Sequence, residues 1–125
     1  MNDLNSVIIE GNIACDTVIK EIGKDNKVCT FRIASHRYYK KDSRTEEDTS
    51  FFNVEAWGKL AETISKCGYK GRGVRITGYL KQEKWMGQDD KPRSKILIYA
   101  LNVEFRKEEN TATAEGPGEE INDID

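Results

Sequence analysis

Hydrophobic and polar residues alternate along residues 49–57, in the pattern of a half-buried β-strand. One row of this segment is apolar and is predicted to face a protein core: Phe52, Val54 and Ala56. The other row combines two large rings with polar side chains: Phe51, Asn53, Glu55 and Trp57. Large rings on the polar side of a strand are typical of residues that contact a partner. The segment therefore predicts a strand with a contact surface on its outer face.

The spacing of apolar residues changes directly after this strand, from a period of two to that of a helix. Leu60, Ala61, Ile64 and Cys67 fall on one face of a short helix. Gly68 follows them, at the position where a helix C-terminus favours a residue that tolerates positive φ. The sequence thus predicts a strand that runs into a helix ending near residue 68.

Apolar runs predict further strands at residues 4–13, 17–22, 28–35, 74–85 and 93–105. The polar and highly charged residues 36–48 are expected to form a long hairpin loop. The predicted fold is all-β: a five-stranded Greek-key barrel of the OB-fold type, with one short helix between strands 3 and 4. The short run at residues 17–22 leaves this strand count open by one.

Charge is distributed unevenly along the chain, although the net charge is only −2. Residues 106–125 contain two basic and seven acidic residues, whereas residues 1–105 contain 18 basic and 15 acidic ones. The terminal segment also has very few apolar residues, which is typical of disorder. We therefore expect an OB-fold domain at residues 1–105 and a disordered acidic tail at residues 106–125.

The chain has no apolar run long enough to cross a bilayer. Its N-terminus also lacks the basic region and apolar core of a secretion signal. We therefore expect a cytoplasmic protein without membrane contacts.

Aromatic and basic residues are interleaved on the predicted outer rows and in the loops between them. Such a mixture is typical of proteins that hold single-stranded nucleic acid, because flat rings stack on bases and cationic groups neutralise phosphates. The alternative is that some rings are packed under loops or in a subunit interface. The predicted nucleic-acid-binding residues are Arg32, Arg37, Tyr39, Phe51, Trp57, Lys59, Arg75, Tyr79, Lys81, Lys84 and Trp85.

No pattern in the sequence points to an enzyme, a cofactor or a metal site. His36 is the single histidine, and no nucleophile is placed beside it by sequence. The cysteines lack the paired spacing of a zinc site. The carboxylates fall on loops, on outer rows and in the tail, so none is expected to have the buried surroundings that favour acid–base catalysis.

Three segments together give the chain a specific resemblance, which covers residues 4–105. They read Val7-Ile8-Ile9-Glu10-Gly11-Asn12, then Val54-Glu55-Ala56-Trp57-Gly58-Lys59-Leu60-Ala61-Glu62, then Gly78-Tyr79-Leu80 with Lys84-Trp85. On these segments the chain resembles the bacterial-type single-stranded-DNA-binding proteins. The resemblance implies an OB-fold that assembles into a homotetramer and wraps single-stranded DNA.

The resemblance also implies roles for individual residues. Rings at the positions of Tyr39, Phe51, Trp57 and Trp85 stack on bases in that family, and a lysine at the position of Lys59 lies along the DNA. Many members have tryptophan in place of Tyr39 and Phe51. Phe52 matches a position near subunit contacts. The apolar terminal strand is also expected to meet another subunit, because an open strand edge needs a partner. The predicted interface residues are Val7, Ile8, Ile9 and Phe52.

Tails in this family usually end in acidic residues followed by Pro-Phe, which docks on replication and repair proteins. This tail ends Asn122-Asp123-Ile124-Asp125 instead. We expect weakened docking through the remaining apolar and acidic residues of the tail: Ile121, Asp123, Ile124 and Asp125.

The sequence therefore predicts a non-enzymatic protein that binds single-stranded DNA without sequence preference. Such binding would protect single strands during DNA replication, recombination and repair, in association with the nucleoid. Two alternatives stay open. One is an OB-fold module that binds RNA, and the other is an interaction domain whose rings lie in a protein interface.

Overall fold

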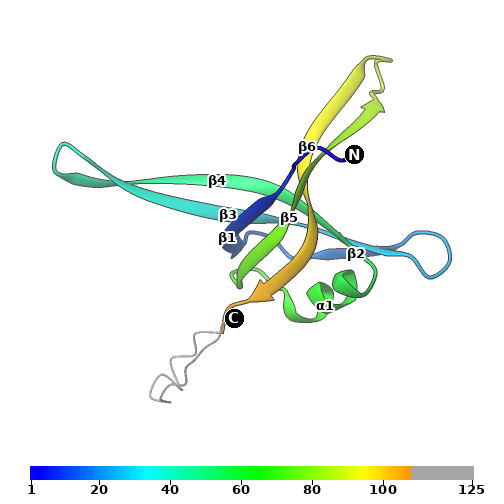
Figure 1. Cartoon of the computed structure of the whole chain (residues 1–125), viewed down its shortest axis with the longest axis horizontal. Coiled ribbons are helices and arrows are strands. Elements are labelled where there is room, and N and C mark those ends of the chain that lie inside the picture. The colour runs from blue at the N-terminus through cyan, green and yellow to red at the C-terminus, as the bar shows by residue number, and fades with distance from the viewer. Residues whose placement is uncertain (108–125) are drawn as a thin grey trace.

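The computed structural model describes residues 1–107, which form one sheet and one helix. The strands in chain order are β1 (Val7–Ile13), β2 (Val18–Glu21), β3 (Lys27–Lys41), β4 (Arg44–Trp57), β5 (Gly73–Met86) and β6 (Pro92–Phe105). The helix α1 (Lys59–Cys67) connects β4 to β5. Two long hairpins leave the centre of the molecule in different directions: β3–β4 to the left and β5–β6 upward (Figure 1).

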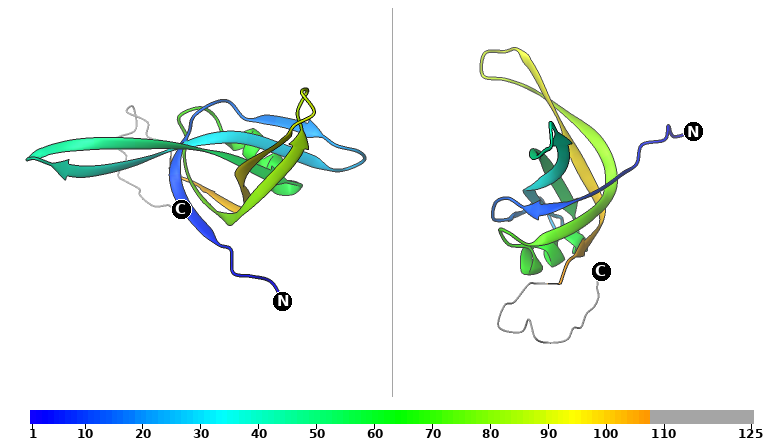
Figure 2. Two further views of the ribbon diagram at one scale, coloured as in Figure 1. Left: turned by 90° about the horizontal axis from the view of Figure 1, so that it is seen from above. Right: turned by 90° about the vertical axis from the view of Figure 1, so that its left-hand side faces the viewer.

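The sheet closes into a barrel because β1 pairs with a strand on each side. The strand order is β1-β5-β6-β4-β3-β2, and β1 also pairs with β3 through Asn12↔Ala34 and Ile13↔Ile33. A glycine permits this closure, since a Cβ at Gly11 would lie 2.5 Å from the Ala34 carbonyl oxygen. The strands consequently curve around a common interior, with α1 at one end (Figure 2).

Alternate residues of the strands fill this interior, together with two residues of α1. The buried cluster consists of Ile13, Cys29, Phe31, Ile33, Val54, Ala56, Ala61, Ile64, Val74, Ile76, Ile98 and Ala100. The inward rows predicted for residues 29–33 and 54–56 are therefore confirmed. Because Ala61 and Ile64 project from α1 into the same cluster, the helix closes one end of the barrel.

The predicted fold class is confirmed. The barrel strands are β1, β3, β4, β5 and β6, and α1 follows the third of them, as in the OB-fold. The remaining strand, β2, has four residues, pairs only with β3 and lies at the edge of the sheet. Strand β2 corresponds to the short run at residues 17–22, which left the predicted strand count open by one.

The prediction of a loop at residues 36–48 is wrong. Strands β3 and β4 stay paired out to Lys41↔Arg44, and only Asp42 and Ser43 form the turn. Both turn residues have positive φ, 53° and 69°, as a tight two-residue hairpin requires. Cross-strand contacts replace a core along this ribbon, including the Tyr38 hydroxyl that donates to Glu47 at 3.2 Å. High polarity therefore indicates here a ribbon with solvent on both faces.

Two further expectations need correction. Gly68 has φ −94°, so it is not a left-handed helix cap. Its small size matters instead, because a Cβ there would lie 2.8 Å from the Ile64 carbonyl oxygen. Phe52 is not part of the core, although it shares a row with Val54. It pairs with Ile33 where the β3–β4 ribbon leaves the barrel, and its side chain is exposed.

Strand β6 ends at Phe105, and the description of the structure ends two residues later. The predicted disordered tail lies outside the described residues, apart from Arg106 and Lys107. The same holds for the predicted partner-binding residues Ile121, Asp123, Ile124 and Asp125. Within residues 1–107, α1 is the single helix, and it is too short to cross a membrane.

Candidate nucleic-acid interface

A row of side chains crosses the outer face of the barrel from β3 to β5. Register pairs Thr30 with Glu55, Glu55 with Tyr99, and Tyr99 with Tyr79. The two tyrosine rings are stacked, with centroids 5.0 Å apart and an angle of 4° between the ring planes. The Lys81 ammonium lies 5.5 Å from the centre of the Tyr99 ring. The sheet thus presents parallel rings beside a cation at its centre.

Glu55 lies in the middle of this row and is only 8% exposed. Its Oε1 accepts a hydrogen bond from the Trp57 indole nitrogen at 3.1 Å and lies 3.9 Å from the Lys81 ammonium. The sequence placed Glu55 correctly on the outer row, but the expectation that no carboxylate has buried surroundings is wrong for this residue. Tyr99, Lys81 and Trp57 come from three strands and surround the carboxylate, which the sequence pattern of β4 alone could not show.

Phe51 extends the same face along β4, four residues before Glu55. Its ring is 54% exposed, and the Arg32 guanidinium lies 5.1 Å from the ring centre. Arg32 pairs with Asn53, so the cation lies between Phe51 and the Glu55 row. Trp57 is half-buried at the other end of the strand. The structure therefore brings Arg32, Phe51 and Trp57 together on one face, as the alternation predicted.

The β5–β6 hairpin carries this face away from the barrel. Trp85 is 46% exposed, and the Lys95 ammonium lies 5.9 Å from its ring centre. Lys95 also lies 3.7 Å from Glu83. Lys95 and Tyr99 were missed in the sequence, although the alternation along β6 places both on the side of Trp85. Lys84 points to the opposite side of the hairpin, because neighbouring residues of a strand alternate.

Arg37 and Tyr39 are separated from the other predicted residues. They lie on the β3–β4 ribbon, with the Arg37 guanidinium 5.2 Å from the Tyr39 ring centre. Their row on β3 is that of Ile33, whereas Phe51 pairs with Ala34 and faces the other side. The ribbon thus presents one aromatic–cation pair on each side. The expectation of a loop hid this division.

Arg75 points toward carboxylates of neighbouring strands. It makes an ion pair with Glu10 at 2.7 Å and lies 3.7 Å from Glu104, while Arg106 also binds Glu10. The hydrogen bond from Arg75 is the main cause that lowers the pKa of Glu10 below its ordinary value. Arg75 is consequently part of an ion-pair cluster between β1, β5 and β6. Lys59 is exposed at the first residue of α1.

The predicted interface residues of β1 do not share one environment. Val7 and Ile9 pack against the core, whereas Ile8 points outward and is 71% exposed. Residues 7–11 of β1 pair only with β5, because the pairing with β3 begins at Asn12. Five of the seven residues of β1 therefore keep one open edge within the described chain.

A groove of about 460 Å³ runs beside the central row of rings. It is formed by β2, β3, β4 and the β5–β6 hairpin, and its lining includes Thr30, Asn53, Glu55, Glu83, Lys95 and Leu97. Its lining carries both signs of charge, with the cations Lys20, Arg32 and Lys95 and the carboxylates Asp16, Glu55 and Glu83.

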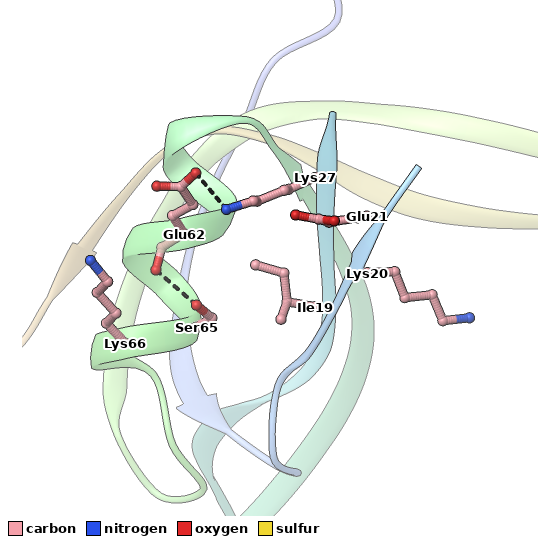
Figure 3. Close-up of a pocket in the computed structure, with 7 residues that line it drawn as sticks. All are labelled: Ile19, Lys20, Glu21, Lys27, Glu62, Ser65 and Lys66. Carbon is pink, nitrogen blue, oxygen red and sulfur yellow. Dashed lines mark hydrogen bonds and ion pairs between the residues drawn. The ribbon is translucent and has the colours of Figure 1, made fainter. Parts of the chain in front are cut away.

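A second pocket, of about 370 Å³, lies between α1 and the β2–β3 hairpin (Figure 3). The Lys27 ammonium reaches across it and lies 3.0 Å from Glu62 of α1. This contact raises the pKa of Lys27 and lowers the pKa of Glu62. No aromatic residue lines this pocket, and the Lys27–Glu62 ion pair links the helix to the hairpin across it. Nowhere in residues 1–107 do histidine, cysteine and carboxylate groups cluster as metal ligands do.

Comparison with known protein families assigns the chain to one of them. The Single-strand binding protein family matches residues 4–106. The chain belongs to this family. The match includes every element of the barrel and all the rings of its outer face.

Curated relatives are similar at the level of sequence. The chain is 34% identical over 105 residues to a single-stranded DNA-binding protein of Treponema pallidum. The aligned region covers 84% of this chain and 59% of that protein. It is 39% identical over 101 residues to a single-stranded DNA-binding protein of Aquifex aeolicus, with coverage of 80% and 68%. The chain thus spans about three fifths to two thirds of the length of these relatives.

A solved structure shows the same fold. It is titled as the Plasmodium falciparum SSB complex with ssDNA, and it superposes with a TM-score of 0.76 over 86% of this chain and 98% of that one. The sequence identity is 23%, so the similarity concerns the arrangement of the strands and the helix.

The pKa shifts of Lys27 and Glu62 predict how the helix attachment depends on pH. A lowered Glu62 pKa stabilises the fold above the ordinary glutamate value of 4.5, and the stabilisation is lost as the pH falls through the lowered value. The Lys27 contribution is lost only in strong base, above 10.5. Lys27→Met should therefore lower the urea midpoint at pH 7, and this difference should vanish at a pH where Glu62 is protonated. The effect should be small, because both groups reach solvent.

Lys20→Met is the matched control, since Lys20 lines the same pocket and has no ion pair within the described residues. Its urea midpoint should follow the parent protein at both pH values. A Lys27→Met deficit that is equal at neutral and acidic pH would contradict the ion pair as its cause.

Proposed function

We propose that this chain binds single-stranded DNA without general sequence preference and acts without catalysis. The observation that carries this proposal is the continuous outer face on which Phe51, Trp57 and Trp85 are accessible beside cations. Family membership supports it, since the curated relatives are named single-stranded DNA-binding proteins. Rings that reach solvent beside cations, as Phe51 and Trp85 do, match the faces of unpaired bases.

Binding on this face combines stacking with charge neutralisation. Bases of a single strand are unpaired and stack on aromatic rings, at roughly 1–3 kcal/mol per base. Arg32, Lys81 and Lys95 lie beside the rings, where phosphates of a stacked strand would pass. Duplex DNA keeps its bases stacked inside, so its rings are not available to this face. The geometry therefore favours single strands over duplexes.

The predicted residues separate into a centre and a periphery in this proposal. The centre consists of Arg32, Phe51, Trp57, Tyr79, Lys81 and Trp85, and Lys95 joins it. The periphery consists of Lys59, Lys84, Arg37 and Tyr39, which lie on other sides of the hairpins or on the helix and would contact DNA only along a longer path. Arg75 is also peripheral, because its charge is balanced by Glu10 and Glu104.

In the cell, the proposed role is to cover single strands that arise in DNA replication, recombination and repair. This role places the protein in the cytoplasm with the nucleoid. The proposed DNA-binding domain comprises residues 1–105. The family match over residues 4–106 supports these bounds. An RNA-binding module would use similar stacking, so the choice of DNA requires a direct comparison.

Assembly into a homotetramer is part of the proposal. The exposed Ile8 and the open edge of residues 7–11 lie on one side of the barrel, and exposed Phe52 lies at the base of the ribbon. An open strand edge with an apolar side chain is a site for pairing with a second copy. Closed, two-fold arrangements are the common result of such contacts.

The acidic tail is proposed as a weak competitor of DNA. All seven of its carboxylates lie in residues 108–125, and the tail is joined directly to a domain with an excess of basic residues. A tethered segment has a high local concentration near its own domain. DNA would displace the tail from the basic face, so that Ile121 and Ile124 become accessible to replication and repair proteins. These aliphatic anchors are smaller than a ring, so such docking would be weak.

Removal of a central ring tests the DNA-binding face. Trp57→Ala and Trp85→Ala should each weaken binding to oligo-dT by about 1–3 kcal/mol, because each removes a stacking platform. Tyr69→Ala is the control, since Tyr69 is also exposed but lies beyond α1, next to Arg72. Fluorescence anisotropy of labelled oligo-dT, oligo-U and duplex DNA measures the effect. Equal affinity for duplex and single strands would refute the proposed function.

Truncation after Lys107 tests the tail. The shortened protein should bind oligo-dT more tightly than the full chain at low salt, since a competing polyanion is gone. The gain should shrink as salt is added, because screening acts over roughly 8–10 Å near physiological ionic strength. Identical salt titrations of the two proteins would show that the tail does not compete.

Sedimentation velocity tests the assembly. At micromolar concentration the full chain should sediment as a tetramer, and Ile8→Asp should shift the distribution toward smaller species. A charged residue at this position would be costly inside an interface but tolerated on a free surface. Ile96→Asp is the control, since Ile96 is similarly exposed but lies on the β5–β6 hairpin, and it should leave the distribution unchanged. A stable monomer of the parent protein would refute the tetramer.

A further inference from the structure

Glu55 places a buried negative charge in a face that also presents rings and cations. Its neighbours along β4, Val54 and Ala56, are buried in the core on the other side of the sheet. Burial of a carboxylate is costly unless hydrogen bonds and opposite charge compensate for it. An apolar side chain at this position would pack against Tyr99 without that cost. Packing alone therefore does not explain a glutamate here.

The two carboxylate oxygens have different surroundings. Oε1 accepts the Trp57 indole hydrogen bond and faces Lys81, at 3.1 Å and 3.9 Å. Within residues 1–107, Oε2 takes part in no hydrogen bond or ion pair. Glu55 also lines the groove beside the rings. One oxygen thus fixes the position of the carboxylate, and the other is available to a ligand in the groove.

We propose that Glu55 is a specificity-determining residue that accepts a hydrogen bond from the exocyclic amino group of a base stacked on Trp57. This inference rests on the proposed function and refines it. An indole N–H donates in the plane of its ring, so the carboxylate lies at the edge of the Trp57 ring. A base stacked on the face of that ring brings its own edge over the carboxylate. The amino group of the base and the Glu55 carboxylate are therefore within hydrogen-bond reach without a rearrangement of β4.

Charge determines which part of DNA meets Glu55. A carboxylate repels phosphates, whereas Arg32 and Lys95 on either side of the groove attract them. The backbone should follow these cations, with base edges turned toward the carboxylate. A carboxylate accepts from the exocyclic amino groups of cytosine and adenine, whereas thymine has a carbonyl oxygen at the corresponding position. Glu55 should thus favour amino-bearing bases and disfavour thymine at one position of each bound strand.

The test compares the ratio of affinities for oligo-dC and oligo-dT in the parent protein and in Glu55→Gln. A glutamine keeps the acceptor for Trp57 and nearly the same shape, but it loses the charge and can donate to thymine carbonyls. The ratio cancels effects of the substitution that are equal for both oligonucleotides. One such effect is the loss of the ion pair between Lys81 and Glu55. The dC-to-dT ratio should fall about threefold to tenfold, the value of one hydrogen bond.

Glu83→Gln is the matched control. Glu83 lines the same groove and faces Lys95, but it lies on the β5–β6 hairpin away from Trp57. This variant removes the same charge from the same groove, so it should change both affinities by the same factor and leave the ratio unaltered.

A modified oligonucleotide makes the test independent of protein folding. Oligo-dC with two methyl groups on each exocyclic nitrogen keeps the rings but has lost the amino donors. The parent protein and Glu83→Gln should both bind it more weakly than oligo-dC, by a similar threefold to tenfold factor, and Glu55→Gln should not distinguish the two oligonucleotides.

The outcomes separate the inference from the proposed function. If the parent protein binds no single-stranded oligonucleotide, the function itself is refuted. If it binds, but the dC-to-dT ratio is the same in Glu55→Gln, Glu55 only positions Trp57 and the inference is overturned. An equal fall of the ratio in Glu83→Gln would also overturn it, because the effect would then belong to the general charge of the groove.

Discussion

Closure of the sheet by β1 is the constraint on which the rest of the structure depends. This strand pairs with β5 over six residues and then with β3 over two, and Gly11 lets its backbone approach Ala34. A similar approach occurs between β5 and β6, where a Cβ at Gly78 would lie 2.0 Å from the Tyr99 carbonyl oxygen. These contacts curve the sheet around its core, and the same curvature brings Tyr79, Tyr99 and Glu55 into one row on the outside.

Alternation predicted which face of a strand each side chain takes, whereas the structure adds the contacts between side chains of neighbouring strands. The inward row of Val54 and Ala56 and the outward positions of Phe51 and Trp57 followed from period two alone. The burial of Glu55 did not, because Lys81 and Tyr99 come from strands more than 25 residues away. The ion-pair cluster of Arg75 was hidden for the same reason, since Glu10 lies 65 residues earlier.

Polarity was the least reliable guide to structure in this chain. Residues 36–48 have the composition of a loop, yet they form most of a paired ribbon, because backbone hydrogen bonds and a tight turn hold two strands together without a core. The resemblance to single-stranded-DNA-binding proteins pointed to Phe51, Trp57 and Trp85, which the structure places on one outer face. It assigned no role to Glu55, because the surroundings of this carboxylate depend on contacts with other strands.

The β3–β4 ribbon differs from the barrel in how firmly it is held. None of the side chains of residues 36–48 is buried, so this segment has backbone hydrogen bonds and surface contacts but no apolar packing. Such segments open locally at a much lower free energy than a core strand. Amide protons of the ribbon should consequently exchange with solvent far faster than those of β1 or of the barrel half of β4. One continuous strand, β4, thus joins a stiff half to a compliant half, and Phe51 lies at the boundary between them.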